Sequence, residues 1–284
     1  MKAAPFEYRQ PSTLDQAIAA LSEAGNGARL LAGGQSLLPM MHLRLVRPRL
    51  LVDLNGLPDL DGIRPAGDGL HIGALTRHRT LETAELPPPF NLLSAAAARV
   101  GSVPIRTRGT FGGSLAHADP AAELPLIAVT LSASVVLRGP ENERAIPAEQ
   151  FLLGAFETAA ADDEIVTSIV LPPAPPRARW AFDETTLPLK VVAAVVVEVE
   201  SDGRCSWARI GLGGIAAAPR RCQQAEAAMV GNPLDRATAE AAAGAAMADL
   251  GATQTVQAHL VHLGGVLVRR AVRRLGEPAL EDGR

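Results

Sequence analysis

A short proline-rich segment, Pro172-Pro173-Ala174-Pro175-Pro176, divides this chain. Proline has no backbone N–H and a fixed φ, so the segment can continue neither a strand nor a helix. Proline runs are also stiff, which is typical of a linker between domains. The sequence therefore predicts one domain over residues 1–172 and a second over residues 177–284.

Strand and helix patterns alternate before the linker. Ser12 precedes apolar residues at helical spacing and is expected to cap that helix, which Gly25 and Gly27 should end. Strand patterns occupy residues 6–8, 29–32, 50–54, 70–74, 134–138 and 164–171, and helical patterns occupy residues 90–100 and 123–131.

Strands precede helices after the linker. Strand patterns lie around Trp180 and over residues 191–199 and 205–212, and helical patterns over residues 219–229, 234–250 and 255–275. Strands followed by helices are typical of an α+β domain. The fold class predicted for the chain is therefore α+β.

Composition and charge argue against several classes of protein. The net charge is −3 and no basic block occurs, so nucleic acid is not an expected partner. The longest apolar run, residues 191–199, is too short to span a membrane. Glu7 and Arg9 stand where a secretory signal would be apolar, so we expect a cytoplasmic protein.

The chain has two cysteines, Cys205 and Cys222. Two thiols cannot hold an iron–sulfur cluster that needs four, and no CxxC pair suggests zinc. The pattern favours two reduced, partly buried thiols, while a disulfide between them stays open.

Two glycine-rich loops carry the strongest chemical signal. Each contains a Gly-Gly pair followed within two residues by a serine: LLAGGQSL over residues 30–37 and RGTFGGSL over residues 108–115. Glycine has no Cβ and permits positive φ, so several backbone N–H groups can converge on one anion. Hydroxyls of Ser36, Thr110 or Ser114 could donate to a phosphate as well. The two loops suit a pyrophosphate held from both sides, although two tight turns would have the same sequence pattern.

Other nucleotide and metal motifs are absent or weak. No GxxxxGK[ST] or HExxH occurs. Residues 211–216 spell GxGxxA after a strand pattern, but Pro219 follows almost at once and no βαβ unit frames them. A strand end and turn is the better interpretation. The pair His117 and Asp119 is too small for a metal site.

Four segments follow one another at a spacing found in one protein family. They are LLAGGQSLLPMMHLRL (30–45), LVDL (51–54), HIGALTRH (71–78) and RTRGTFGGSLAHADPAAELP (106–125). With ARIGLGGIAAAPRR (208–221), they resemble the FAD-binding (medium) subunit of molybdenum hydroxylases. That family includes the medium subunits of carbon monoxide, nicotine, caffeine and quinoline dehydrogenases, and it is similar to the FAD domain of xanthine dehydrogenase.

The resemblance implies a PCMH-type FAD-binding domain of two α+β subdomains, about residues 1–57 and 58–172, and a C-terminal α+β domain. Both loops would wrap the FAD pyrophosphate, Glu123 would contact the ribityl chain, and Val100 and Val166 would make apolar contacts with FAD. The implied FAD-binding residues are Leu30, Leu31, Ala32, Gly33, Gly34, Gln35, Ser36, Leu37, Val100, Thr110, Phe111, Gly112, Gly113, Ser114, Glu123 and Val166.

The resemblance also implies partners. A large subunit would carry molybdopterin, a small subunit would carry [2Fe-2S] clusters, and the complex would be a dimer of heterotrimers. This chain would pass electrons from the clusters to an external acceptor, with no catalytic residue and no metal ligand of its own. Two alternatives stay open: a free-standing FAD oxidoreductase of the same fold, and a scaffold subunit that has lost FAD.

One segment departs from the family pattern. Relatives often carry an aromatic, a lysine, an Arg pair and an Asp-aromatic pair between the linker and the long apolar strand. Here residues 182–192 read FDETTLPLKVV, so only the aromatic, Phe182, is kept. Where relatives often show Tyr-Arg, His259-Leu260 stands. The resemblance implies that these changes would fall at the outer face of the flavin, while the glycine loops keep the family pattern.

Overall fold

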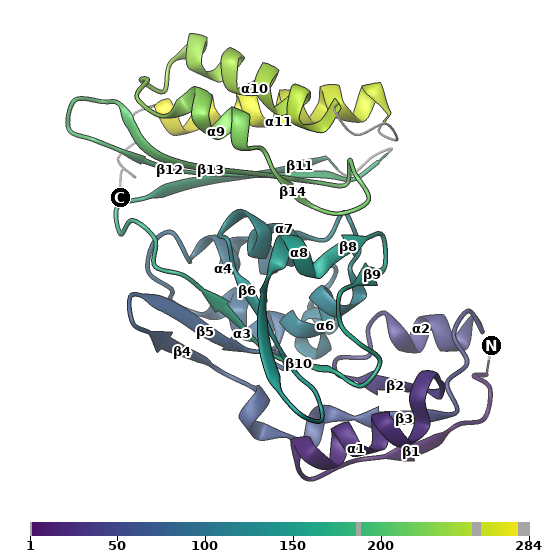
Figure 1. The fold of residues 1–284 in the computed structure, drawn as a ribbon. Helices are drawn as coiled ribbons and strands as arrows, with labels where there is room; N and C mark the ends of the chain where they lie inside the picture. The colour runs from purple at the N-terminus through teal and green to yellow at the C-terminus, as the bar shows by residue number, and fades with distance from the viewer. Residues whose placement is uncertain (1, 186–188, 252–256, 278–284) are drawn as a thin grey trace. The chain divides into compact units, whose positions relative to one another are not determined.

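The structure is a computed structural model, and it describes residues 2–185, 189–251 and 257–277. Contacts divide the chain into two compact units (Figure 1). Unit 1 comprises residues 1–84, 97–119 and 132–173, and unit 2 comprises residues 85–96, 120–131 and 174–284. Two segments from before the linker thus belong to unit 2. That residues 1–172 and 177–284 fold as separate domains stays a prediction.

Unit 1 begins with a three-stranded parallel sheet in the order β1-β3-β2. Its elements are β1 (Glu7–Arg9), α1 (Leu14–Ala24), η1 (Gly25–Gly27), β2 (Ala28–Leu31), α2 (Leu37–His42), β3 (Leu50–Asp53), η2 (Leu54–Gly56) and η3 (Pro58–Leu60). Helix α1 buries Ala17, Ile18 and Leu21 in one apolar cluster with the strands. The predicted cap was wrong by one residue: Thr13 Oγ1 accepts from Gln16 N at 3.3 Å, whereas Ser12 bonds to the Gln16 side chain.

A second, antiparallel sheet completes unit 1, in the order β4-β5-β10-β6-β7. Its strands are β4 (Ile63–Ala66), β5 (Gly69–Gly73), β6 (Ser134–Arg138), β7 (Glu143–Pro147) and β10 (Ile165–Leu171). The accompanying elements are α3 (His78–Thr83), α5 (Val103–Arg108), α6 (Phe111–His117), α8 (Ala148–Phe151), β8 (Leu152–Gly154) and β9 (Glu157–Thr158). The two sheets with their helices form the two α+β subdomains that the family resemblance implied.

Unit 2 is built on a four-stranded antiparallel sheet, β11-β12-β13-β14. Its elements are α4 (Leu92–Ala97), α7 (Glu123–Thr130), β11 (Arg179–Thr185), β12 (Val191–Val199), β13 (Cys205–Gly213), β14 (Arg220–Arg221), α9 (Gln223–Met229), α10 (Arg236–Gly251) and α11 (Ala258–Gly276). Helices α9, α10 and α11 cover one face of the sheet, and α7 lies against the other (Figure 1). Strand β12 is therefore apolar on both faces, as its unbroken run of valine and alanine predicts.

The GxGxxA string ends β13 and then turns, as expected. Gly211 lies opposite α7, and a Cβ there would stand 2.0 Å from Thr130 Oγ1. Gly214 has φ +77° and turns the chain out of the strand. These glycines thus serve close helix–sheet packing and a turn.

The starts of two predicted C-terminal helices are not confirmed. The helix predicted from residue 219 begins at Gln223, because Arg220–Arg221 pair with β13 as a strand. Thr255, the predicted start of the last helix, lies outside the described residues. Cys205 and Cys222 are buried thiols that form no disulfide. The α+β fold class is confirmed, and no helix among the described residues is long and apolar enough to cross a membrane.

Candidate functional site

The first glycine loop connects β2 to α2 and leaves a row of backbone donors open. Gly34 has φ +71°, a left-handed conformation that suits glycine, and Ser36 returns to the right-handed helical region. Among the described residues, no acceptor takes a hydrogen bond from the N–H groups of Gly34, Gln35 or Ser36. The Gln35 side chain donates to Gly33 O at 3.1 Å. Successive N–H groups in such a turn form a concave anion site.

The second glycine loop was predicted wrongly as a loop over most of its length, because α6 begins at Phe111 and takes Gly112, Gly113 and Ser114 into its first turns. Only Gly109 and Thr110 join α5 to α6, and most of the backbone donors are already used. Gly112 N donates to Ala74 O at 2.9 Å, and Gly113 N donates to Thr110 Oγ1 at 3.1 Å. Ser114 N donates to Thr110 O at 3.0 Å. This loop can therefore offer an anion the Ser114 hydroxyl more readily than these N–H groups.

The two loops meet, backbone against backbone. A Cβ on Gly33 would stand 2.4 Å from Arg108 O and 2.7 Å from Gly109 Cα. A Cβ on Gly113 would lie 3.8 Å from Ala32 Cβ. Only a residue without a side chain allows the approach at Gly33.

Gly112 is required for packing inside the protein. Its Cβ would stand 2.5 Å from Ala74 Cβ, just beyond the end of β5. Ala74 also donates its N–H to Thr167 O at 2.9 Å. Through these bonds the second loop is tied to β10, next to Val166 and the bulge between Val166 and Ser168.

The buried His78 orients the second loop. Its Nε2 lies 2.9 Å from Thr110 O and 3.0 Å from Ser114 Oγ. A carbonyl oxygen cannot donate, so Nε2 carries the proton for the Thr110 bond. The Ser114 oxygen then faces an N–H, which leaves the hydroxyl proton of Ser114 available to another acceptor.

A series of hydrogen bonds through Asn55 and Arg77 joins the backbone of the first loop to that of the second. The sequence did not predict it. Asn55 Nδ2 donates to Ala32 O at 2.9 Å, and Arg77 Nη2 donates to Asn55 Oδ1 at 2.6 Å. Arg77 Nη1 donates to Arg108 O at 2.5 Å. Asn55 and Arg77 both lie within or next to the family segments LVDL and HIGALTRH, which is the only signal that pointed toward them.

Asp53 anchors this series of hydrogen bonds at the end of β3. Its Oδ1 accepts from Asn55 N at 2.9 Å, and its Oδ2 accepts from Tyr8 Oη at 2.5 Å. Burial acts to raise the pKa of Asp53, but the hydrogen bonds from Tyr8 and Asn55 outweigh it and hold that pKa below its usual value. Asp53 is therefore an ionised acceptor at neutral pH.

The remaining predicted contacts in unit 1 are partly open. Leu30, Leu31, Ala32, Ser36, Leu37, Val100 and Val166 are half-buried, and Gln35 is exposed. The half-buried apolar side chains of the first loop, beside its open N–H groups, suit a ligand that is part phosphate and part ring system.

Glu123 belongs to unit 2, where a cation meets it. It begins α7, and its nearly buried carboxylate accepts a hydrogen bond from Lys190 Nζ. Lys190 Nζ also lies 4.0 Å from Glu184 Oε2. Lys190 and Glu184 both come from the segment that departs from the family pattern, and Asp183 of that segment pairs with Arg270 at 3.2 Å. Thr186, Leu187 and Pro188 lie outside the described residues.

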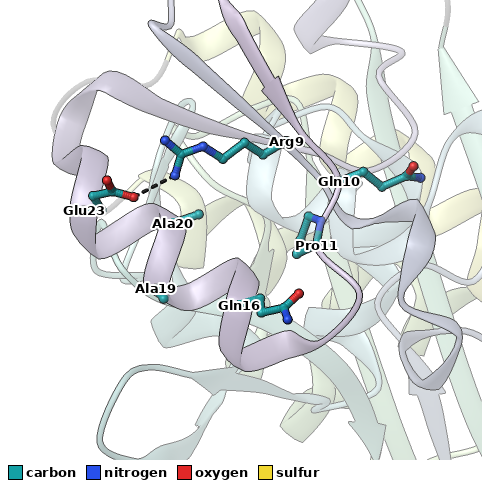
Figure 2. Close-up of a pocket in the computed structure, with 7 residues that line it drawn as sticks. All are labelled: Arg9, Gln10, Pro11, Gln16, Ala19, Ala20 and Glu23. Carbon is teal, nitrogen blue, oxygen red and sulfur yellow. Dashed lines mark hydrogen bonds and ion pairs between the residues drawn. The ribbon is translucent and has the colours of Figure 1, made fainter.

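A separate hollow of about 350 Å³ lies between β1 and α1 (Figure 2). Its charged side chains satisfy each other, since Arg9 Nη1 donates to Glu23 Oε2 at 2.7 Å. None of the predicted FAD contacts lines it.

Comparison with known proteins gives matches over nearly the whole chain. Residues 4–174 match the family described as the FAD binding domain in molybdopterin dehydrogenase. Residues 190–275 match the CO dehydrogenase flavoprotein C-terminal domain.

Curated relatives match from end to end. The alpha subunit of the 6-hydroxypseudooxynicotine dehydrogenase complex of Paenarthrobacter nicotinovorans is 37% identical, over 100% of this chain and 97% of its own length. The carbon monoxide dehydrogenase medium chain of Hydrogenophaga pseudoflava is 33% identical, over 94% of this chain and 96% of its own length.

Solved structures agree with the sequence matches. A carbon monoxide dehydrogenase from Hydrogenophaga pseudoflava superposes with a TM-score of 0.88 at 35% identity, covering 96% of this chain and 97% of that one. One from Oligotropha carboxidovorans gives a TM-score of 0.89 at 33% identity, covering 96% and 98%.

Proposed function

Since this chain belongs to the family of FAD-binding medium subunits of molybdenum hydroxylases, we propose that it is the electron-transfer subunit of such a complex. It takes electrons from [2Fe-2S] clusters on a small partner subunit and passes them to an external acceptor. A large partner subunit carries molybdopterin and oxidises the substrate. The assembly is a dimer of these heterotrimers.

The observation that carries the proposal is the meeting of the two glycine loops beside a row of open N–H groups. Gly34, Gln35 and Ser36 point donors at no protein acceptor among the described residues, and the Gly33 contact brings the second loop against them. A pyrophosphate would accept from these N–H groups and from the Ser36 and Ser114 hydroxyls. The residues present therefore fit FAD.

Other residues would shape the rest of the FAD site. Leu30, Leu31, Ala32 and Leu37 flank the first loop, and Val100 and Val166 supply apolar surface. Thr110, Phe111, Gly112 and Gly113 set the path of the second loop. Glu123 would contact the ribityl chain, and the hydrogen bond from Lys190 Nζ holds its carboxylate in place.

Bound FAD would supply the redox centre, while the protein binds and orients it. The one hydroxyl–imidazole pair among the residues named here is Ser114 with His78, and His78 Nε2 carries its proton toward Thr110 O, so it is not a general base for Ser114. The proposed role accordingly requires no proton transfer to or from a substrate on this chain.

The first experiment is an absorbance spectrum of the purified chain. Bands of an oxidised flavin, with about one FAD per chain, are the expected result. A folded, colourless chain that also takes up no added FAD would favour the scaffold alternative, which the altered segment 182–192 motivates.

The second experiment separates an electron-transfer subunit from a free-standing oxidoreductase. Substrate oxidation with one dye acceptor is compared between the single chain and the complex with its partners. We expect turnover from the complex alone. Equal rates from both preparations would show that the chain is an enzyme by itself.

A further inference from the structure

We propose that Asn55 and Arg77 act as a clasp that fixes the spacing of the two glycine loops and thereby sets how tightly the chain holds the phosphates of FAD. Neither residue is among the predicted FAD contacts, and both are positioning residues. The inference rests on the proposed function, because it assumes that the loops bind FAD.

The clasp is continuous from one loop to the other. It runs from Ala32 O through the Asn55 amide and the Arg77 guanidinium to Arg108 O, by bonds of 2.9, 2.6 and 2.5 Å. Its two ends fall at the place where Gly33 touches the backbone of the second loop. A change in the clasp therefore acts directly on the separation of the loops.

Each residue type is needed for this arrangement. An asparagine amide can donate to Ala32 O and accept from Arg77 at the same time, which neither Asp nor Leu can do. The planar guanidinium of Arg77 presents two donors in a fixed fork, one for Asn55 and one for Arg108 O. Lysine, with a point charge on a flexible stem, would serve both partners poorly.

The clasp also sets the direction of backbone dipoles. In a trans peptide the C=O and the following N–H point to opposite sides. Holding Ala32 O in the clasp therefore turns the N–H of Gly33 away from it, at the start of the row of open donors. It also turns the Ala32 and Arg108 oxygens toward Asn55 and Arg77, so that their partial negative charge is compensated there and opposes an incoming anion less.

Charged groups of both signs surround the clasp. Arg77 is half-buried, and Arg108 lies close enough that its charge lowers the pKa of Asp53. Asp53 is the one buried carboxylate in this group, and its oxygens are engaged by Tyr8 and Asn55. The exposed Asp61 also acts electrostatically on Arg77, so this group holds two cations and two carboxylates. The clasp therefore acts through its hydrogen bonds rather than through an excess of positive charge.

The test uses the full chain stripped of FAD, with FAD titrated back and followed by quenching of flavin fluorescence. The variants are Arg77→Met, Arg77→Lys, Asn55→Ala and the double variant Arg77→Met with Asn55→Ala. Arg64→Met is the matched control, because the exposed Arg64 also donates to backbone carbonyls, of Asp59 and Asp61, but away from the loops. The unfolding midpoint of each FAD-free variant is measured as well.

We expect Arg77→Met and Asn55→Ala each to weaken FAD binding roughly 10- to 100-fold, the range for a lost hydrogen bond to a charged group. Arg77→Lys should recover part of the loss, and Arg64→Met should change the Kd less than about twofold. Since the two residues act through one chain of bonds, the double variant should be about as weak as the weaker single variant.

Several results would overturn the clasp. One is a wild-type Kd in the folded Arg77→Met and Asn55→Ala variants, with only the unfolding midpoint lowered. Another is a double variant whose loss equals the product of the single losses. If Arg77→Met does not fold, Arg77→Lys and Asn55→Ala decide in the same way. A wild-type chain that binds no FAD would instead refute the proposed function, and the clasp with it.

Discussion

The contact between the two loops can be tested at one atom by the substitution Gly33→Ala. The added Cβ would stand 2.4 Å from Arg108 O, where carbon–oxygen contacts are ordinarily about 3.3 Å or longer. The loops must therefore separate by about 1 Å, since the obstacle is backbone and cannot rotate away. Overpacking of this kind costs about 1–3 kcal/mol. Gly33 itself has no positive φ, so the cost comes from space alone.

The assay has two readouts and a control at Gly27, which immediately precedes β2. Urea unfolding of the FAD-free chain should show stability lower by about 1–3 kcal/mol, and FAD affinity should fall at least about tenfold as the loops separate. Gly27→Ala is the control, because its Cβ meets the Arg49 guanidinium, the movable end of a side chain, at 2.6 Å. It should stay within about 0.5 kcal/mol of the wild type. A Gly33→Ala chain with wild-type stability and affinity would refute the contact.

Three further predictions concern other parts of the molecule. Gly211→Ala should lower the stability of unit 2 by about 1–3 kcal/mol, measured by urea unfolding, because its Cβ would stand 2.0 Å from Thr130 Oγ1 in α7; an unchanged midpoint would contradict that packing. The pKa of Asp53 is lowered on folding, so its contribution is complete above the unfolded pKa of about 3.9 and is lost as pH falls below it. Asp53→Asn should make unfolding less pH-dependent below about pH 4, and an acid transition identical to the wild type would count against this. Lys190→Met should lower the free energy of unfolding by about 1–3 kcal/mol, because it leaves the buried Glu123 side chain without its cation. Adding Glu123→Gln should restore most of that stability, and a double variant as unstable as Lys190→Met would show that the pair is not the cause.

Much of the fold could be predicted from the sequence because its signals are local. The unbroken apolar run of β12 predicted a strand buried on both faces, and the structure places α7 on one face and α9, α10 and α11 on the other. Pro219 argued correctly against a dinucleotide-binding helix after β13. The errors are also local: Ser12 and its neighbour Thr13 both carry a hydroxyl that can cap a helix, and the sequence does not say which of them faces the first turn.

The parts that could not be predicted depend on distant residues. Nothing near Asn55 in the sequence indicates that its amide bonds to Ala32 O, 23 residues away, or that Arg77 completes the chain. Helix α7 is likewise separated from β12 and β13 by the linker, yet it packs with them in unit 2. Lys190 meets Glu123 across 67 residues. Such pairs are set by tertiary structure, which a single sequence does not display.

The two glycine loops differ in a way that their sequences do not predict. Both contain a Gly-Gly pair followed by a serine, and the sequence therefore predicts that both bind the pyrophosphate. In the structure, the N–H groups of Gly34 and Ser36 face no protein acceptor among the described residues, whereas those of Gly112 and Gly113 are bound to Ala74 O and Thr110 Oγ1. We therefore propose that the first loop donates hydrogen bonds to the phosphates, while the second offers the Ser114 hydroxyl and the backbone against which the first loop packs. A Gly112→Val variant would lose FAD through the clash with Ala74, so it cannot report on the phosphate site. Ser36→Ala, which removes one donor and leaves the backbone intact, is the substitution that can: it should weaken FAD binding without moving the unfolding midpoint of the FAD-free chain, and a shift in that midpoint alone would place the hydroxyl in the protein's own structure.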